Sequence, residues 1–480
     1  MRDFVLLYVN GRRHEVRGGQ VFQPLSEFLR AALRLTGTKV ACAEGDCGSC
    51  TVLIGRVQGD RIVYRPVTSC IEYVAQLDGA HVISVEGLLQ NGALNPVQAG
   101  MVAHHGAQCG YCTPGIVVAL CALFDQTRDP SRCEASNALV GNLCRCTGYD
   151  SILEAAAHAD RTAFTPLAEI YDDGEILREL TDAAHSSAAV SDGSRQLFKP
   201  ASLDEAVRLR ASHPDATVLA GGTDLGIAWN KRLREVATLI CVGDLGELKE
   251  SRVQANNWTI GAATTISEME EACTSVLPAY RQMLERFGSP QIKNSGTLGG
   301  NLANGSPVGD TMPGLFVLDA EVEFIGPRGA RRVNINQFYT GYRRSVMAAD
   351  ELIRRVVVPL PGPDELFGTF KISKRYDLDI SSFAAAVWMH VENGIVRAAR
   401  IAFGGVAPTI VRLPRTEAWL SERQLCESTL RAAGKVVREE ITPISDVRGS
   451  AEYRLLLAEN SLLRFARDAL ENREPVSNGA

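Results

Sequence analysis

The residues best suited to chemistry are cysteines, and they are concentrated near the N-terminus. Ten of the 13 cysteines lie within the first 146 of the 480 residues. Three follow a C-x4-C-x2-C pattern and a fourth comes after the next two predicted strands, which is the plant-type spacing for a [2Fe–2S] cluster. These candidate ligands are Cys42, Cys47, Cys50 and Cys70. Gly45 and Gly48 would let backbone amides approach the cluster sulfurs. The alternative is a loop of structural cysteines without metal.

A second group of four cysteines follows. Cys109 and Cys112 lie at the start of a predicted helix, and Cys144 and Cys146 come farther along the chain. Two close pairs of thiolates could hold a second [2Fe–2S] cluster or a tetrahedral zinc ion, for which C-x2-C pairs are common. A C-x-C pair is less usual for structural zinc, and the neighbouring iron–sulfur loop favours a second redox centre. The remaining two cysteines of this region are interpreted as packing or surface residues: Cys121 and Cys133.

A different candidate site occurs in the middle of the chain, where two runs are rich in glycine. Residues 217–225 predict a strand that enters a Gly-Gly turn, and residues 294–310 contain five glycines among 17 residues. Backbone N–H groups freed by such turns can bind a pyrophosphate. Neither run is the G-x-G-x-x-G dinucleotide motif, and plain turns are the alternative.

The elements around the first cysteine group predict a small β domain. Residues 4–9 alternate as a strand, Asn10-Gly11 is a hairpin turn and 14–16 begin the return strand. Residues 24–35 carry apolar side chains at helical spacing. Further strands are predicted at 51–54 and 61–64.

The elements around the second cysteine group predict helices. Thr113 can cap a helix whose first turn contains Pro114. Further helices are predicted at 134–140 and 151–159, and residues 165–196 lack a sustained apolar period and predict a connecting segment.

The rest of the chain alternates strand-like and helical runs, which predicts a mixed α+β domain. The predicted strands are 217–220, 239–242, 258–260, 322–325, 356–358, 382–391 and 395–403, and the predicted helices are 203–211, 266–273 and a C-terminal group. An Asn393-Gly394 turn joins the last two strands. There is no internal repeat.

Composition limits the class of protein. The length predicts about three domains, and 45% hydrophobic with 22% charged residues is typical of a globular chain. The net charge of −6 argues against nucleic-acid binding. No apolar run approaches the length of a bilayer span and no signal peptide is recognisable. We therefore expect a soluble, cytoplasmic protein, in which clustered cysteines bind metal more often than they form disulfides.

The order of the two cysteine groups identifies a family. The plant-type pattern followed by C-G-Y-C-T-P-G and N-L-C-R-C-T-G-Y resembles the iron–sulfur part of the molybdenum hydroxylases, the xanthine dehydrogenase and aldehyde oxidase family. The resemblance implies five segments: a ferredoxin-like β-grasp (1–88), a four-helix [2Fe–2S] domain (89–165), a linker (166–196), a vanillyl-alcohol-oxidase-type FAD-binding domain (197–365) and a small α+β flavoprotein domain (366–480). Gln108 and Cys146 match positions near the pterin of the family.

The same resemblance assigns the flavin contacts. It places the first diphosphate loop at Thr217, Val218, Leu219, Ala220, Gly221, Gly222, Thr223 and Asp224. It places the second loop, with its ribityl and diphosphate contacts, at Thr297, Gly300, Asn301, Asn304, Ser306 and Asp310. Phe287 matches an aromatic beside the flavin ring, Ile353 an adenine-side contact and Lys371 a basic residue near the ring. The alternatives are core packing for Phe287, a solvated surface lysine at 371 and a turn cap at Asp310.

Two details of the flavin region differ from the family or stay open. Gly222-Thr223-Asp224 replaces the Asn-Thr-Glu common in animal enzymes, which shortens the acid and keeps its charge. Residues 371–379 match a loop that tunes access of NAD or oxygen to the flavin, and a solvated loop is the alternative.

The resemblance implies an electron relay without catalytic residues of its own. Two [2Fe–2S] clusters would pass electrons from molybdopterin on a partner subunit to FAD and then to NAD, while the partner oxidises hypoxanthine and xanthine to urate. The expected assembly is an α2β2 heterotetramer. The alternatives are the same relay for an aldehyde, carbon monoxide or aromatic-CoA partner, a zinc-stabilised binding or scaffold protein, and a reductase for an oxygenase. The last would require an NAD-binding domain, whose motif is absent from the sequence.

Overall fold

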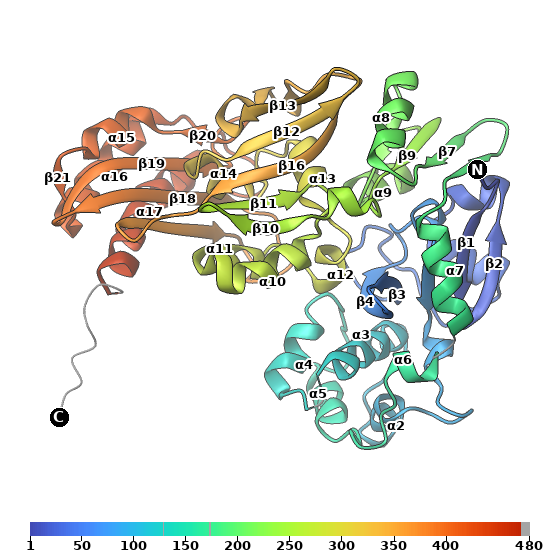
Figure 1. Cartoon of the computed structure of the whole chain (residues 1–480). Coiled ribbons are helices and arrows are strands. Elements are labelled where there is room, and N and C mark those ends of the chain that lie inside the picture. The colour runs from blue at the N-terminus through green and yellow to red at the C-terminus, as the bar shows by residue number, and fades with distance from the viewer. Residues whose placement is uncertain (128, 172–173, 472–480) are drawn as a thin grey trace. The chain divides into compact units, whose positions relative to one another are not determined.

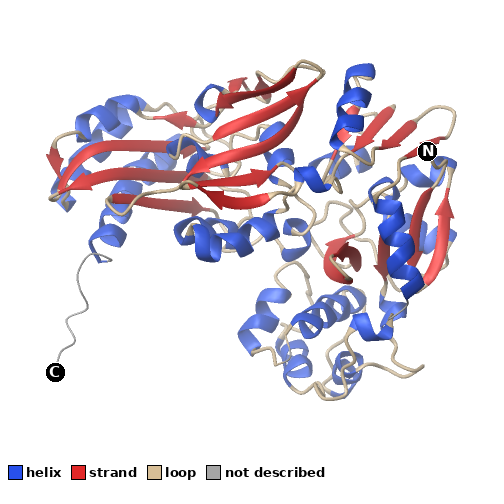
Figure 2. Cartoon of the chain, viewed as in Figure 1, coloured by secondary structure: helices blue, strands red, loops and turns tan. Residues whose placement is uncertain are grey.

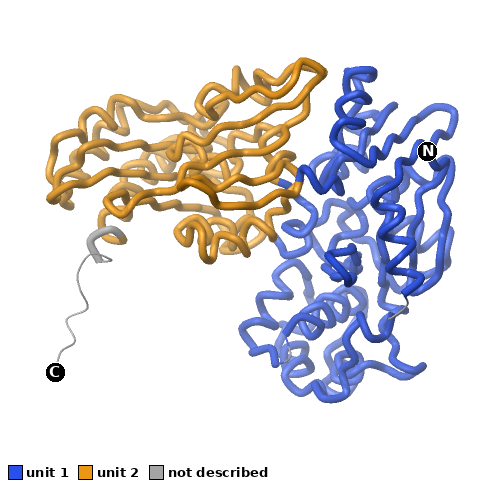
Figure 3. Tube along the Cα trace, in the orientation of Figure 1, with its two compact units in different colours: residues 1–248, 289–297 blue, residues 249–288, 298–480 orange. Residues whose placement is uncertain are grey.

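The computed structural model describes residues 1–127, 129–171 and 174–471. It divides into two compact units (Figure 3). Unit 1 comprises Met1–Leu248 with Ser289–Thr297, and unit 2 comprises Lys249–Gly288 with Leu298–Ala480. The division falls inside the predicted FAD-binding stretch 197–365. Residues 172–173 of the predicted linker and 472–480 of the predicted C-terminal domain lie outside the described residues.

The N-terminal part of unit 1 is built on a five-stranded sheet (Figure 1). The predicted hairpin is confirmed, because Asn10 and Gly11 take the positive φ values of 47° and 79° that a tight turn between the strands needs. The strand order is β2-β1-β5-β3-β4, with β5 parallel to β1. The bounds are β1 (Val5–Val9), β2 (Arg12–Val16), β3 (Thr51–Gln58), β4 (Arg61–Thr68) and β5 (Ala80–Ile83). The predicted helix at 24–35 is shorter: α1 (Leu25–Glu27) passes into a π-helical turn, Phe28–Ala32.

Four helices follow, and three of them lie close to the positions predicted from the residues. They are α2 (Pro96–Ala103), α3 (Thr113–Gln126), α4 (Arg132–Ala138) and α5 (Asp150–Ala157). The prediction that Thr113 caps α3 is wrong. Cys112 already has helical angles of −81° and −17° and occupies the N-cap, so Thr113 is the first helical residue.

The stretch predicted to be a plain connection has regular structure. It contains α6 (Leu167–Ile170), α7 (Gly174–Ala184) and β6 (Ala188–Ser191). Ile176, Leu180 and Ala183 form a buried stripe on α7. Charged residues stand between them, so the apolar period is weak in the sequence. A buried ion cluster holds the end of α7. Arg2 and Lys199 bind Asp78 at 2.7 and 3.0 Å and donate to the Ala183 carbonyl at 3.1 and 2.9 Å.

A four-stranded sheet completes unit 1. Its order is β6-β7-β9-β8, with β7 (Gln196–Lys199), β9 (Thr238–Cys241) and β8 (Thr217–Leu219) mutually parallel. The helices are α8 (Leu203–Ser212), α9 (Thr223–Asn230) and α12 (Pro290–Lys293). One hydrophobic core contains side chains from both sheets of unit 1, among them Leu7, Val82, Leu197 and Leu239. The predicted ferredoxin-like segment and the first part of the predicted FAD-binding segment are therefore packed into one body.

Unit 2 contains two antiparallel sheets, visible as the longest strands in Figure 2. The first has the order β10-β11-β16-β12-β13: β10 (Ser251–Gln254), β11 (Asn257–Gly261), β16 (Leu352–Pro359), β12 (Glu321–Gly326) and β13 (Gly329–Asn334). The second has the order β17-β18-β19-β20, with β21 beside β19: β17 (Glu365–Ile372), β18 (Phe383–Glu392), β19 (Ile395–Gly404), β20 (Val411–Arg412) and β21 (Arg423–Gln424). A short ribbon joins β14 (Tyr339–Gly341) and β15 (Arg344–Ser345). These strands match the predicted mixed α+β class.

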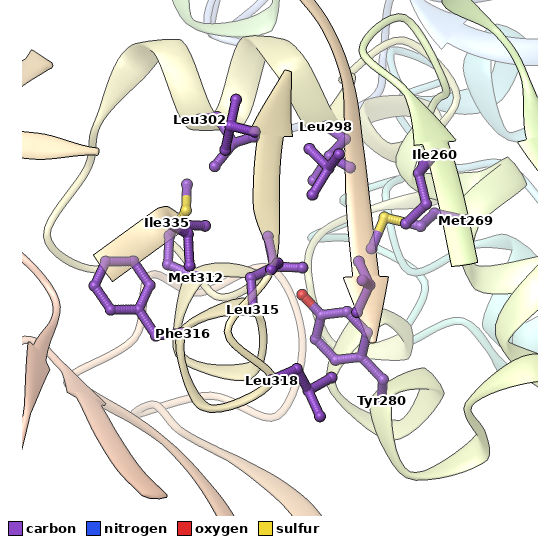
Figure 4. Close-up of a cluster of buried hydrophobic side chains, with 14 of the residues drawn as sticks. Ile260, Met269, Tyr280, Leu298, Leu302, Met312, Leu315, Phe316, Leu318 and Ile335 are labelled. Carbon is purple, nitrogen blue, oxygen red and sulfur yellow. The ribbon is translucent and has the colours of Figure 1, made fainter. Parts of the chain in front are cut away.

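Helices cover these sheets and build the core of unit 2. They are α10 (Ile266–Val276), α11 (Pro278–Glu285), α13 (Leu298–Asn304), α14 (Met312–Val317), α15 (Pro414–Leu420), α16 (Glu427–Glu440) and α17 (Ala451–Glu471). Figure 4 shows Met269, Tyr280, Leu298 and Leu315 from four of these helices meeting in one apolar cluster. Among the described residues, no helix is both long and apolar enough to cross a membrane.

Candidate functional site

The first cysteine group converges in unit 1. Cys42, Cys47 and Cys50 lie on the loop before β3, and Cys70 follows β4. The Cys42 thiol interacts with those of Cys47 and Cys70, and Cys50 interacts with Cys70. Cys50 and Cys70 are buried, whereas the other two are half-buried. The tertiary fold therefore places all four thiols in one site.

The environment of this group favours thiolates at two of its positions. Hydrogen bonds from Cys47 and Cys70, together with the backbone N–H groups of Glu44 and Cys47, lower the pKa of Cys42. The Cys70 thiol likewise lowers the pKa of Cys50 despite its burial. Cys47 and Cys70, which donate these hydrogen bonds, have raised pKa values. The four thiols are thus linked by hydrogen bonds into one group.

Glycines allow the loop its close approaches. Gly45 and Gly48 have φ values of +75° and +66°, which residues with a Cβ rarely adopt. A Cβ at Gly45 would lie 2.5 Å from the side chain of Ile71, and one at Gly48 would collide with the carbonyl oxygen of Gly141. The loop is thus closely packed on its surroundings at both glycines.

The second cysteine group is arranged as two sulfur pairs. The Sγ atoms of Cys109 and Cys146 are 3.5 Å apart, and Cys112 interacts with Cys144. No group of three or more His, Cys, Asp or Glu side chains within the described residues is arranged to hold one metal ion. A two-iron cluster needs two thiolates at each iron, and two sulfur pairs supply that number.

The remaining residues of this region lie as the sequence indicates. Cys121 is buried on α3, where burial raises its pKa to about 12, and Cys133 is exposed on α4. Neither belongs to a sulfur pair. Gln108 is exposed and adjoins Cys109.

The loops of the two cysteine groups are hydrogen-bonded to each other. The Asn142 amide donates to the Gly48 carbonyl at 3.0 Å, and the Leu143 N–H donates to the Cys47 carbonyl at 2.9 Å. The buried Asn142 in turn accepts from Gln291 at 2.8 Å. Sequence reasoning did not single out Asn142, although it stands two residues before Cys144 at the start of N-L-C-R-C-T-G-Y. These hydrogen bonds hold the loops of the two candidate cluster sites side by side.

The first glycine run forms a tight turn between β8 and α9. Gly222 has a φ of +69° and is the N-cap of α9. A Cβ at Gly221 would overlap the carbonyl oxygen of Ser295, so this run packs directly on the start of the second. The first amides of a helix lack intrahelical partners and can bind phosphate oxygens. The turn therefore fits a diphosphate, and Asp224 beside it is exposed.

The other predicted flavin contacts belong mostly to unit 2. Thr297 lies in unit 1, whereas Phe287, Gly300, Asn301, Asn304, Ser306, Asp310, Ile353 and Lys371 lie in unit 2. Asn301 accepts from the Thr311 hydroxyl at 2.6 Å. Ile353 is a member of the hydrophobic core. The structure places Ile353 among core side chains, and its adenine-side contact stays a prediction.

Lys371 is a buried cation. It is 4% exposed, and its Nζ donates to Asp310 at 2.7 Å and to the Arg286 carbonyl at 2.7 Å. The alternative of a solvated surface lysine is wrong, because the β17 position points inward. Asp310 also accepts from Ser381 at 2.5 Å. Burial raises the pKa of Asp310, and the charge of Lys371 opposes that shift.

Phe287 adjoins this ion pair. Its carbonyl oxygen lies 3.5 Å from the Lys371 Nζ, and its half-buried ring packs against the core of unit 2. Three predicted flavin contacts, Phe287, Asp310 and Lys371, are therefore together. Ser381, which sequence reasoning missed, completes the group, and a serine after a charged loop carries no signal that could have revealed it.

Comparison with known proteins gives three family matches. A model of the FAD binding domain in molybdopterin dehydrogenase matches residues 192–361. A model of the CO dehydrogenase flavoprotein C-terminal domain matches 368–469. A [2Fe-2S] binding domain matches 84–157, which includes all four cysteines of the second group.

Relatives and solved structures extend these matches. The chain is 29% identical to xanthine dehydrogenase 1 of Arabidopsis thaliana and 31% identical to xanthine dehydrogenase of Drosophila subobscura, over 96% of its own length and 39% of theirs. It thus spans about two fifths of these relatives. A Cu,Mo-CO dehydrogenase structure is 31% identical with a TM-score of 0.54, covering 57% of this chain and 96% of that one. Quinoline 2-oxidoreductase from Pseudomonas putida 86 is 28% identical with a TM-score of 0.53 and the same coverage.

Proposed function

The chain belongs to the molybdenum hydroxylase family and carries its iron–sulfur and FAD-binding parts, and from this premise we propose that it is the electron-transfer subunit of a xanthine dehydrogenase. The observation that carries the proposal is the direct hydrogen bonding between the loops of the two cysteine groups, at Asn142–Gly48 and Leu143–Cys47. A relay requires its centres to be close, and these contacts fix the two loops against each other. No residue of this chain is assigned to breaking the C–H bond of the substrate.

The cysteines hold the two clusters in this proposal. Cys42, Cys47, Cys50 and Cys70 bind a plant-type [2Fe–2S] cluster in a ferredoxin-like β-grasp, and Cys109, Cys112, Cys144 and Cys146 bind a second in the four-helix region. When bound, such clusters exchange single electrons, whereas a flavin exchanges one or two. Apolar side chains pack around the buried half of the first site: Val40, Ile71, Ile227 and Ile292.

The proposed flavin-binding residues contact different parts of FAD. The Gly221-Gly222 turn and the first amides of α9 hold phosphate oxygens, and the second glycine run contributes Thr297, Gly300, Asn301, Asn304 and Ser306. Lys371, paired with Asp310 beside Phe287, supplies a fixed buried cation for the ring. The family match to an FAD binding domain over 192–361 supports the assignment of the residues in that range, and Lys371 lies in the flavoprotein C-terminal domain matched at 368–469.

The partner and the reactants are further parts of the proposal. A molybdopterin-containing subunit hydroxylates hypoxanthine and xanthine, NAD accepts the electrons and two heterodimers form an α2β2 assembly in the cytoplasm. Support comes from xanthine dehydrogenases that align with 96% of this chain and extend well beyond it. The second candidate is the same relay for carbon monoxide or an N-heteroaromatic substrate, which the CO dehydrogenase and quinoline oxidoreductase structures favour equally by identity.

Cofactor content and a co-purifying subunit test the proposal. The protein should carry about four irons, about four sulfides and about one FAD, and reduction should give two distinct [2Fe–2S] paramagnetic signals. The complex should reduce NAD with xanthine as donor. Stoichiometric zinc with no iron would contradict the relay, and a partner without molybdopterin would contradict the assignment. Activity with carbon monoxide or quinoline in place of xanthine would select the second candidate.

A further inference from the structure

The C-terminal end of α9 is hydrogen-bonded to both segments that supply the first cysteine group. The Asn230 side chain donates to the Ala43 carbonyl at 3.0 Å and to the Cys70 carbonyl at 2.7 Å. Its Oδ1 accepts from the Tyr73 hydroxyl at 2.7 Å. Ala43 follows Cys42 directly, so a single amide joins the loop of the first three cysteines to the loop of the fourth. All three hydrogen bonds of the amide are made to these two loops.

The neighbours of Asn230 on α9 hold the same two segments. Trp229 stacks on Tyr73 with ring centroids 4.2 Å apart and planes 10° from parallel. Lys231 forms an ion pair with Glu44 at 2.6 Å, which contributes little because both side chains are largely exposed. The aromatic stack and the hydrogen bonds of the Asn230 amide therefore contribute most of the stabilisation between α9 and these segments.

The body of α9 is seated on the same cysteine loop. A Cβ at Gly226 would lie 2.5 Å from the Ile71 carbonyl oxygen, so only glycine permits this approach. Ile227 packs against the apolar cluster of Cys50, Cys70 and Ile71. The helix has eight residues and is about 12 Å long at 1.5 Å per residue. Its other end is the Gly221-Gly222 turn assigned to the FAD diphosphate.

From this arrangement we infer that α9 couples two events. FAD binding at its N-terminus stabilises the two loops of the first cysteine group, which contact its C-terminus. Asn230 is the positioning residue for these loops. The inference rests on the proposed function, because it takes the glycine turn as the diphosphate site. Phosphate oxygens at the first amides stabilise a short helix, and a helix fixed at one end holds its contacts better at the other. Coupling of this kind is reciprocal, so an intact cluster also tightens FAD binding.

Asn230 can be truncated without creating a sealed cavity. Its side chain lines an open pocket of about 420 Å³ together with Cys70 and Ala43. Large losses of stability on truncating a core side chain come from the closed cavity that is left. Asn230→Ala would only enlarge an open pocket, so its cost in stability should be small. Tyr73→Phe offers a finer change, since it keeps the stack on Trp229 and removes only the hydroxyl. Asn95→Ala is the matched control: this buried amide also joins two segments, donating to the Leu88 carbonyl at 2.9 Å, without touching the first cysteine group.

The experiment measures iron loss from the full chain, reconstituted with iron and sulfide and prepared with and without FAD. A chelator is added, and the amplitude of the first cluster's paramagnetic signal is followed. We expect FAD to slow iron loss in the wild type by about tenfold, the worth of one or two hydrogen bonds. The effect should be clearly smaller in Asn230→Ala, which keeps the stack of Trp229 on Tyr73. Tyr73→Phe should be intermediate. Asn230→Ala should also change the shape of the signal and weaken FAD binding to the cluster-loaded protein.

Three outcomes would overturn the inference. One is an equal FAD effect in the wild type and Asn230→Ala, and another is an Asn95→Ala variant that loses the effect as fully. The third is a wild type that binds both cofactors with no FAD effect at all. A wild type that takes up neither iron nor FAD would instead contradict the proposed function, and the inference would fall with it.

Discussion

Removing the buried cation at Lys371 should destabilise unit 2 strongly, and more at neutral than at acidic pH. The side chains of Lys371 and Asp310 are 2% and 7% exposed, with Nζ and Oδ2 2.7 Å apart. Lys371→Met keeps most of the side-chain volume. Among the described residues, it leaves the Asp310 carboxylate with the hydrogen bond from the Ser381 hydroxyl and the charge of Arg286. Breaking a buried pair from one side costs about 3–5 kcal/mol, because the other charge stays buried and unpaired.

The pH dependence follows from the pKa of Asp310. Burial already raises this pKa, and Lys371 opposes the shift, so Lys371→Met raises it further. A carboxyl whose pKa is higher in the folded than in the unfolded state binds more protons when folded, and stability then falls as pH rises. The penalty of Lys371→Met should be full above the raised folded pKa. It should fade as the pH falls towards about 4, the unfolded value.

Calorimetry of the FAD-free chain can test both expectations. At pH 7 a loss of about 3 kcal/mol lowers the melting temperature by roughly 6–12 °C for a body of this size. The double variant Lys371→Met/Asp310→Asn removes the unpaired charge and should recover much of the loss, since the two sites are coupled. Equal melting temperatures for the wild type and Lys371→Met at pH 7 would refute the reasoning. A double variant no more stable than the single one would refute it as well.

Three further expectations concern unit 1. Gly48→Ala should lose the iron of the first cluster, because its Cβ meets a backbone oxygen. Gly59→Ala, which also has a positive φ of +65° but open space around it, should keep that iron; iron analysis compares the two. Asn142→Ala should alter the paramagnetic signals of both clusters and leave FAD content unchanged, and altered FAD with unaltered signals would argue against its bridging role. Asp78→Asn should cost about 3–5 kcal/mol at pH 7. Burial raises the pKa of Asp78, but bonding to Arg2 and Lys199 outweighs burial and lowers it. The stability that Asp78 gives the wild type is therefore full above about pH 4 and is lost as the pH falls towards the lowered pKa. The urea midpoint of Asp78→Asn should not change over that pH range.

Local patterns in the sequence were sufficient for the hairpin, most strands and the two groups of cysteines that are proposed to bind metal. The spacing of Cys42, Cys47 and Cys50 is a property of one loop, and a hairpin turn such as Asn10-Gly11 acts over four residues, so neither depends on distant contacts. Where the apolar pattern was diluted by charge, as in α7, the same reasoning missed an ordered helix. Its buried stripe becomes visible only once the sheet that it covers is known.

The sequence by itself determined the chemistry of this protein: two groups of four thiols, two glycine-rich turns and the family to which that order belongs. Only the tertiary structure decided how these groups are joined. Asn142 meets Gly48 across 94 positions of the chain, and Asn230 meets Cys70 across 160. Burial of Lys371 depends on its pairing with Asp310, 61 positions away. Ligand spacing is a local property of the backbone, whereas burial and long-range hydrogen bonding depend on how separate segments pack, and no local pattern encodes that.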